Sequence, residues 1–277
     1  MYIAMSEETK IQKSIEFISK KLDLSPQIAM ITGTGFSNIT KIIEVVTKIP
    51  YEEIPNFPVP TVKSHTGMLV FGKVKDKTIV AMEGRIHLYE GYNPKDIAFV
   101  IRVMAGLGAK YLLITSAVGG IDPFLETGDF VLINDHINFT GTNPLIGKNI
   151  DSIGIRFPDM SSAYPAHLRK LAIQAAIKKG IRLKEGIYAG VLGPCLETPA
   201  ETRFLRIAGG HVVGMSTVQE VITAVHCGVQ VLAIGVVTNV NSPDCMAPSV
   251  IEDIISVAEN TSDILSVLWK SIIAELQ

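Results

Sequence analysis

Short apolar runs rich in β-branched residues alternate with helical segments along this chain. The strand-like runs are IAMIT, YLLIT, DFVLIND, GIYAGVL, HVVGM and VQVLAIGVVTN. Apolar residues at helical spacing predict a helix over 10–22. Asn93-Pro94, a cap followed by proline at the first helical position, predicts another that runs to Gly106 or Gly108. Strands that alternate with helices predict an α/β fold with its ligand site in the loops at the strand ends.

The second half of the chain carries further start and stop signals. Pro165 and Gly180 are predicted to bound a helix. The stretches Thr198–Glu201, Thr217–Glu220 and Ser249–Glu252 match the capping box and predict more helix starts. LVFGKV and TIVAME flank KDK and predict a β-hairpin. The sequence contains no internal repeat, linker or charge run, so we expect residues 1–277 to form a single domain.

Composition excludes several classes of protein. The chain has 277 residues, 47% hydrophobic and 19% charged, with a net charge of −2, so a strongly basic nucleic-acid surface is not expected. Arg102 and Lys110 interrupt the most apolar stretch, which predicts no membrane span, and MYIAMSEETK lacks the pattern of a secretory signal. Cys195, Cys227 and Cys245 show no CxxC spacing. Disulfides and structural zinc are therefore not expected, and a cytoplasmic location fits best.

Small residues and hydroxyls follow four of the predicted strands. The four loops contain Gly33-Thr34-Gly35, Ser116–Gly120, Met215–Thr217 and Thr238-Asn239. Such loops let a backbone approach a ligand and donate amide N–H groups. GTGFSN lacks the third glycine of a dinucleotide fingerprint and the Lys-Ser/Thr ending of a P-loop. The pattern indicates a shared site for an anion or polar ligand without either nucleotide motif.

The stretch GRIHLYEGY is the densest candidate for chemistry. Arg85, His87 and Tyr89 alternate, so on an extended segment they project from one face. Together they suit an oxyanion, because an arginine fork pairs with phosphate oxygens. The same spacing also fits a solvated edge strand with an Arg85–Glu90 pair. Spacing alone leaves both interpretations open.

Several motifs in order resemble one known family. GRIHLYEGY, TSAVGGI, DHINFTGTNPL, RFPDMSSAY, GPCLETPAE, VGMSTVQEV and VVTN are similar to those of the trimeric purine nucleoside phosphorylases of the inosine/guanosine type. The matches run from about Gly33 to Asn239. The resemblance implies a single-domain α/β fold with a twisted mixed sheet flanked by helices, and a homotrimer. It implies reversible phosphorolysis of purine (2′-deoxy)ribonucleosides to free base and (deoxy)ribose 1-phosphate, a reaction of purine salvage.

The resemblance also implies a site for each part of the substrates. The implied phosphate-binding residues are Thr34, His65, Arg85, His87, the backbone at Ala117, and Ser216. The implied nucleoside-binding residues are Tyr89, Phe157, Leu196, Glu197, Val213, Gly214, Met215, Asn239 and Ile251, with Phe157 closing a neighbouring subunit's pocket. His87, Glu197 and Asn239 are the implied catalytic residues, and Glu90 is expected to orient His87. No cofactor and no metal are expected, and inorganic phosphate is the expected co-substrate.

The chemistry of the reaction agrees with these residue types. Cleaving an N-glycosidic bond builds cation-like charge on the ribose while the purine leaves as an anion. Asn239 can accept a proton-bearing N7 and donate to a 6-oxo oxygen, and Glu197 can accept from N1–H. The sequence therefore predicts chiefly 6-oxopurine nucleosides, inosine and guanosine, as substrates.

The chain departs from the family pattern at three positions. Leu196 stands where an aromatic residue is usual, Cys195 where serine is common, and Ile251 where a histidine that contacts the ribose 5′-hydroxyl is expected. Ile251 favours an alternative, a phosphorylase for 5′-methylthio nucleosides. Asn239 argues against it, because family members that accept 6-aminopurines have aspartate there. A nucleoside-binding protein without catalysis is a further alternative, against which the intact Arg85, His87 and Ser216 argue.

Overall fold

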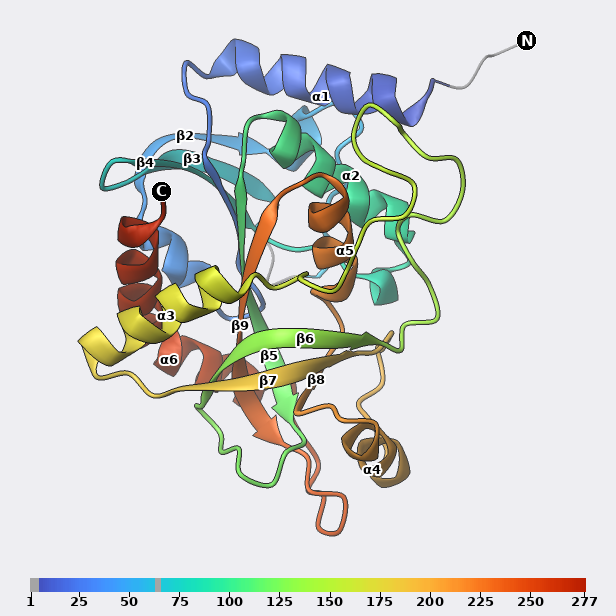
Figure 1. Ribbon diagram of the computed structural model, residues 1–277, viewed down its shortest axis with the longest axis vertical. Coiled ribbons are helices and arrows are strands. Elements are labelled where there is room, and N and C mark those ends of the chain that lie inside the picture. The colour runs from blue at the N-terminus through green and yellow to red at the C-terminus, as the bar shows by residue number, and fades with distance from the viewer. Residues whose placement is uncertain (1–4, 63–65) are drawn as a thin grey trace.

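Within residues 5–62 and 66–277, which the computed structural model describes, nine strands form one mixed sheet (Figure 1). The strands are β1 (Ile28–Ile31), β2 (Glu44–Pro50), β3 (Met68–Val74), β4 (Lys77–Glu83), β5 (Tyr111–Gly120), β6 (Phe130–Asn138), β7 (Leu183–Gly190), β8 (Val212–Gly214) and β9 (Gln230–Val240). Their order is β2-β3-β4-β1-β5-β8-β7-β6-β9, and β9 also pairs with β5. The second half of the sheet therefore closes on itself as a small barrel.

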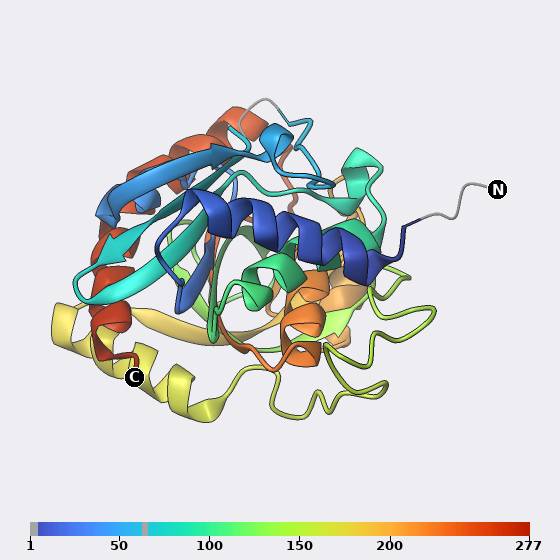
Figure 2. The ribbon, with the colours of Figure 1, turned by 90° about the horizontal axis from the view of Figure 1, so that it is seen from above.

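Helices cover both faces of the sheet (Figure 2). They are α1 (Glu7–Lys21), α2 (Pro94–Gly106), α3 (Ala166–Lys179), α4 (Pro199–Ile207), α5 (Val218–His226) and α6 (Ile251–Glu275). In β1, Ala29 and Ile31 pack in the core shared with α1, α2 and α5, whereas Ile28 and Met30 pack in the core shared with α3 and α6. A strand buried on both faces explains why IAMI is apolar throughout. The predicted α/β fold with a mixed sheet is confirmed.

Most of the local signals correspond to real boundaries. The helix from Pro94, the hairpin of β3 and β4, and the helix between Pro165 and Gly180 are confirmed. Thr198 and Glu201 form the predicted capping box at the start of α4. No helix in the described part of the chain is long and apolar enough to cross a membrane.

Two of the predicted capping boxes are wrong. Thr217 precedes α5 but its side chain caps no backbone N–H, and Glu220 pairs with Arg85 instead. A buried guanidinium is a stronger partner for a carboxylate than a neutral N–H, because the attraction acts between full charges. Helix α6 begins at Ile251 after an uncapped Val250, two residues beyond the predicted cap Ser249.

Candidate active site

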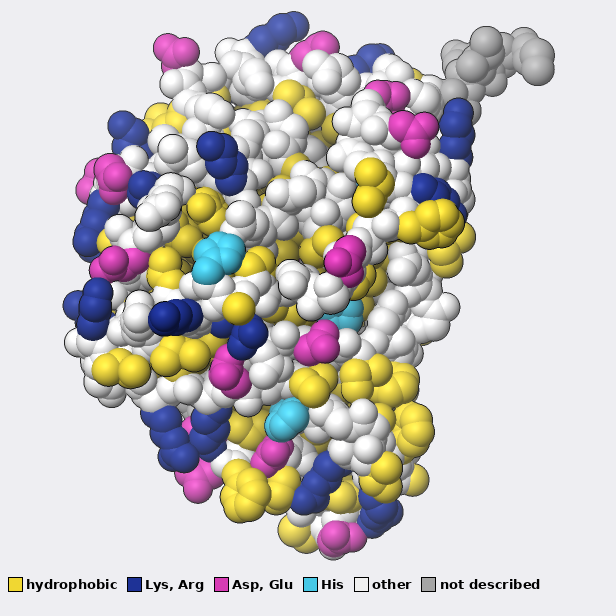
Figure 3. Space-filling view, in the orientation of Figure 1, with side chains coloured by type: hydrophobic (Ala, Val, Ile, Leu, Met, Phe, Trp, Pro, Cys, Tyr) yellow, Lys and Arg dark blue, Asp and Glu magenta, His cyan; other side chains and the backbone are white. Residues whose placement is uncertain are grey.

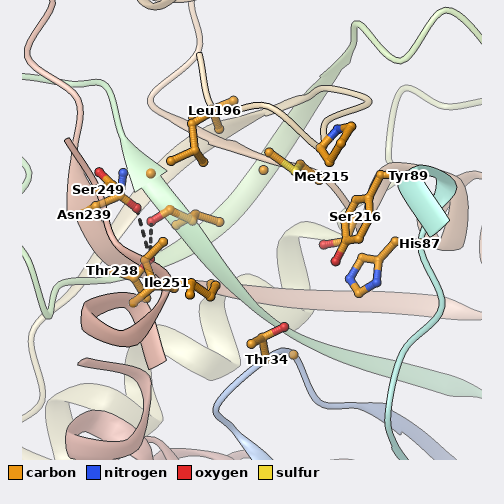
Figure 4. A pocket seen from close by; sticks show the side chains of 18 of the residues that line it. Thr34, His87, Tyr89, Leu196, Met215, Ser216, Thr238, Asn239, Ser249 and Ile251 are labelled. Atoms are coloured by element: carbon orange, nitrogen blue, oxygen red, sulfur yellow. Dashed lines mark hydrogen bonds between the residues drawn. The ribbon is translucent and has the colours of Figure 1, made fainter. Parts of the chain in front are cut away.

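A cavity of about 390 Å³ lies at the carboxyl ends of β1, β4, β5, β8 and β9, bordered by the start of α6 (Figure 4). It collects all four of the predicted loops and the GRIHLYEGY segment. The predicted site residues in its wall are Thr34, Arg85, His87, Tyr89, Ala117, Leu196, Glu197, Val213, Gly214, Met215, Ser216, Asn239 and Ile251. Phe157 does not line it, and His65 lies outside the described residues.

Arg85 is the charged centre of one end of the cavity. Its side chain is 2% exposed, and its Nη1 donates to Ser116 Oγ (3.1 Å) and Ser216 Oγ (2.9 Å). Its Nε lies 2.8 Å from Glu220 Oε1, so the buried charge is paired. Arg85 Nη2 is buried and has no partner among the described residues. An arginine held this way, with the unpartnered Nη2 and the Ser216 hydroxyl beside it, suits an oxyanion.

A strained turn presents Ser216 to this end. Thr217 has φ +69° and ψ −53°, and the N–H of Val218 donates to Ser216 O (2.7 Å), which makes a γ-turn. A non-glycine residue in such a conformation costs about 1–3 kcal/mol. The hydroxyl pair of Thr217 and Ser116, 2.7 Å apart, and the hydroxyl of Tyr188, which accepts from Ser216 N–H (3.1 Å), hold the turn in place.

His87 is oriented by Glu90, as expected. Its Nδ1 lies 2.9 Å from Glu90 Oε1, which also accepts from the backbone N–H of His87 (2.8 Å). Burial raises the pKa of Glu90, but hydrogen bonds from His87 and Thr61 outweigh it and lower the pKa to about 2. The carboxylate is therefore ionised at neutral pH and fixes a proton on His87 Nδ1. The alternative Arg85–Glu90 pair is not present, because each of the two has another partner.

Tyr89 lies beside His87 on the cavity wall. The two rings stack with centroids 4.6 Å apart. Burial and the nearby Glu90 raise the pKa of Tyr89 to about 12, against the opposing effect of Arg85, so its hydroxyl is neutral. Residues 88–90 form a 3-10 turn rather than the predicted extended segment. His87, just before the turn, keeps an extended backbone, and all three side chains still line the cavity.

Asn239 lies at the other end of the cavity from His87 and Ser216 (Figure 4), and Glu197 also lines the wall. A bulge between β5 and β9 pairs Val118 with Val237 but Gly119 with Asn239, so Thr238 is the extra residue. The bulge places two consecutive side chains, Thr238 and Asn239, in the cavity wall. Thr238 Oγ1 donates to Asn239 Oδ1 (3.2 Å).

Glu197 is partly buried, and this burial raises the pKa of its carboxyl group. Desolvation raises the pKa of Glu197, with a further increase from Glu201, while hydrogen bonds from its own backbone and from Asn241 act the other way. Between the two ends, Met215, Leu196 and Ile251 supply an apolar wall (Figure 4). No group of three or more metal-ligating side chains occurs in residues 5–62 and 66–277.

The model of the phosphorylase superfamily matches residues 27–274. Purine nucleoside phosphorylase 1 of Geobacillus stearothermophilus is 46% identical over 91% of this chain and 92% of its own. The chain belongs to the purine nucleoside phosphorylase family. It is therefore an enzyme, as the sequence predicted.

Solved structures of this family match the fold closely. Isoform 2 of the purine nucleoside phosphorylase from Schistosoma mansoni, in complex with cytosine and ribose-1-phosphate, superposes with a TM-score of 0.93, at 43% identity over 97% of this chain and 96% of that one. The Schistosoma mansoni purine nucleoside phosphorylase in complex with inosine gives a TM-score of 0.90 at 38% identity, over 97% and 96%. The motifs that predicted a purine nucleoside phosphorylase thus identified the family correctly.

Sequence reasoning missed several residues of this phosphorylase site. Glu220 and Tyr188, which hold Arg85 and Ser216, were not among the predicted site residues. Thr238, in a loop already singled out, and Ser249 also line the cavity. The signal for Glu220 was a charged side chain in the largely apolar helical stretch VQEVITAV, but its spacing from Thr217 matched a capping box instead.

Proposed function

We propose that the chain catalyses reversible phosphorolysis of purine (2′-deoxy)ribonucleosides, chiefly inosine and guanosine, as a single domain over residues 1–277. Inorganic phosphate is the co-substrate, and no metal or organic cofactor takes part. The observation that carries the proposal is one cavity with a paired arginine and hydroxyls at one end and an amide with a carboxylate at the other. Phosphorolysis needs both an anion site and a site for the leaving purine.

In the proposed mechanism, phosphate binds Arg85, Ser216, Thr34, His87 and the backbone at Ala117. One of its oxygens then bonds to the anomeric carbon as the bond from that carbon to N9 breaks, while the phosphate dianion stabilises the cation-like charge on the ribose. The electron pair of the broken bond leaves with the purine, which takes up a proton from water at N7. Asn239 donates to O6 and accepts from N7–H as the base leaves, and Glu197 accepts from N1–H. Tyr89 and Met215 border the ribose between the two ends, and Val213 and Gly214 lie beside the base.

Release of base from inosine and guanosine should require phosphate. We expect hypoxanthine and guanine, with ribose 1-phosphate in equal amount, only when phosphate is present, because the buried Arg85 and the Ser216 hydroxyl favour an oxyanion over water as the nucleophile. The measurement is product release with inosine, guanosine and adenosine, with and without phosphate. Base release at the same rate without phosphate would identify a hydrolase, and binding without turnover would support the alternative of a nucleoside-binding protein.

We also propose a cytoplasmic homotrimer with shared pockets. Phe157 is 83% exposed in a loop, with Arg156 Cζ 5.4 Å from its ring centre, and α4 presents Phe204 and Ile207 at 56% and 80% exposure. Apolar side chains gather over α4 in the space-filling view (Figure 3). Large exposed apolar groups favour an interface. Sedimentation should give about three times the chain mass of 30.0 kDa. A fully active monomer would contradict the shared pocket.

The 5′ position of the ribose should be recognised loosely. Ile251, 54% exposed, and Ile254 line the cavity where the family resemblance expects a histidine. A site without a hydrogen-bonding group cannot strongly reject an analogue that lacks the hydroxyl. We expect 5′-deoxyinosine to be cleaved within about tenfold of inosine, measured as kcat/KM. A loss of several orders of magnitude would show that another group, such as Ser249, binds that hydroxyl. Comparing 5′-methylthioinosine with inosine tests the 5′-methylthio alternative in the same assay.

A further inference from the structure

A chain of hydrogen bonds connects the two residues proposed to bind the base. Asn239 Nδ2 donates to Asn241 Oδ1 (2.8 Å), and Asn241 Nδ2 donates to Glu197 Oε2 (3.0 Å). Asn241 therefore bridges Asn239 and Glu197, although it is not part of the cavity wall. The bridging residue was not identified from the sequence.

Asn241 is held firmly in this position. Its residue is 5% exposed, and its backbone N–H donates to Gly120 O (2.7 Å), just beyond the last paired residue of β9. Asn239 and Asn241 are two residues apart, so along an extended backbone they share a face. Their amides lie over Gly119, where an added Cβ would stand 3.0 Å from Asn241 Nδ2 and 3.4 Å from Asn239 Nδ2. Glycine at this position leaves room for the pair.

The direction of the hydrogen bonds follows from Glu197. An ionised carboxylate only accepts, so Asn241 must present its NH₂ group to Glu197 and its carbonyl oxygen to Asn239. Asn239 must then present its own NH₂ group to Asn241. Thr238 Oγ1 shares its proton between Asn239 Oδ1 (3.2 Å) and Val118 O (3.3 Å), which agrees with this orientation. The Asn239 amide keeps one N–H and one oxygen lone pair, the set that O6 and N7–H of a 6-oxopurine need.

We propose that Asn241 is a positioning residue that fixes the amide orientation of Asn239 and keeps Glu197 in its accepting form, and so determines the preference for 6-oxopurines. The proposal rests on the proposed base site. Burial raises the pKa of Glu197, and the hydrogen bond from Asn241 opposes the increase. Losing that bond should extend protonation of Glu197 to higher pH, where a protonated carboxyl no longer accepts from N1–H as a carboxylate does.

Two substitutions test the two parts of the proposal. Asn241→Ala should lower kcat/KM for inosine about tenfold, through the KM for the nucleoside, and lower the inosine-to-adenosine ratio about fivefold or more. The KM for phosphate should stay within twofold, because Asn241 touches only the base end. Asn241→Asp, nearly isosteric, places an acceptor against Glu197 and should move the acid limb of the inosine kcat/KM profile up by about one pH unit or more.

Ser14→Ala is the matched control. Ser14 is fully buried in α1, with hydrogen bonds to Pro55 O (2.5 Å) and Lys10 O (3.2 Å), and it does not line the cavity. Its loss should affect thermal stability while leaving the base ratio and the pH profile unchanged. If Asn241→Ala fails to fold, the pH profile and base ratio of Asn241→Asp decide the question.

Three outcomes would overturn the proposal. The first is Asn241 variants whose inosine-to-adenosine ratio of kcat/KM stays within twofold of the parent and whose acid limb does not move. The second is a KM for phosphate that rises as much as the KM for inosine. The third is a Ser14→Ala variant that shows the same changes in the base ratio and the acid limb. Asn239→Asp, measured in parallel, separates the two levels of inference. If Asn239→Asp changes the inosine-to-adenosine ratio but the Asn241 variants do not, only the positioning role of Asn241 is rejected. If Asn239→Asp leaves that ratio unchanged, the base site itself is rejected.

Discussion

The Asn239→Asp variant should cleave inosine more slowly, and adenosine relatively faster, than the parent enzyme. Inosine offers an O6 acceptor and an N1–H donor, whereas adenosine offers an N6 donor and an N1 acceptor. The substitution replaces the amide donor facing O6 with an acceptor, which suits N6. Each mismatched buried polar group costs about 1–3 kcal/mol, so we expect the inosine-to-adenosine ratio of kcat/KM to fall about 10²-fold or more.

The neighbouring amide adds to this effect. Asn241 Oδ1 now accepts from Asn239 Nδ2 (2.8 Å), and the introduced carboxylate would face it acceptor to acceptor. The KM for phosphate should change little, because Ser216 lies at the other end of the cavity (Figure 4) and Arg85 donates to its hydroxyl there. The decisive measurement is kcat/KM for both nucleosides with both proteins. An unchanged ratio, or a parent that already prefers adenosine, would show that the base site is assigned wrongly.

Loss of Arg85 should weaken the use of phosphate by about 10²-fold or more in kcat/KM for phosphate, because charge-assisted contacts to a dianion are lost. Arg85→Ala alone would leave Glu220 buried without its partner, which typically costs about 3–5 kcal/mol of stability. The double substitution Arg85→Ala with Glu220→Gln removes the charge of both partners together. We expect this double variant to be folded and to show the full loss.

Binding of the free base provides the internal control for this experiment. The dissociation constant of hypoxanthine, measured by calorimetry without phosphate, should stay within about threefold of the parent value, since Asn239 and Glu197 are untouched. The single variant Glu220→Gln keeps the Arg85 charge and should show a smaller loss in phosphate use. A normal phosphate response in the double variant is incompatible with Arg85 as part of the anion site.

Much of the local structure was readable from the sequence because its causes are local. Pro94 at the first helical position determines where α2 begins, and Pro165 just before the first turn and Gly180 after the last one bound α3. Alternating or continuous apolar runs determine the strands. Ordered motifs from Gly33 to Asn239 were enough to identify the family, and they named most of the cavity wall.

Local patterns misled where a distant partner competes for the same side chain. Glu220 stands three residues after Thr217, as in a capping box, but the buried Arg85, 135 positions earlier in the chain, takes its carboxylate. Tyr89 was expected on an extended segment, yet it lies in a 3-10 turn that still directs it to the cavity. For Glu220 the reason is that a buried arginine left without a counter-charge is costly, so the glutamate carboxylate pairs with Arg85 rather than capping a helix.

The arrangement of the base end was decided by tertiary structure alone. The extra residue at Thr238 exists only in the pairing of β9 with β5, and it places Thr238 and Asn239 together in the wall. Glu197 lies in the loop that follows β7, and this loop passes beside the end of β9. Asn241, 44 positions later in the chain, therefore donates to its carboxylate. The sequence determined which groups are available to bind a purine and a phosphate. Only the packing of the strands determined which amide faces which carboxylate, because hydrogen bonds between remote segments depend on strand register and burial, neither of which is a local property of the chain.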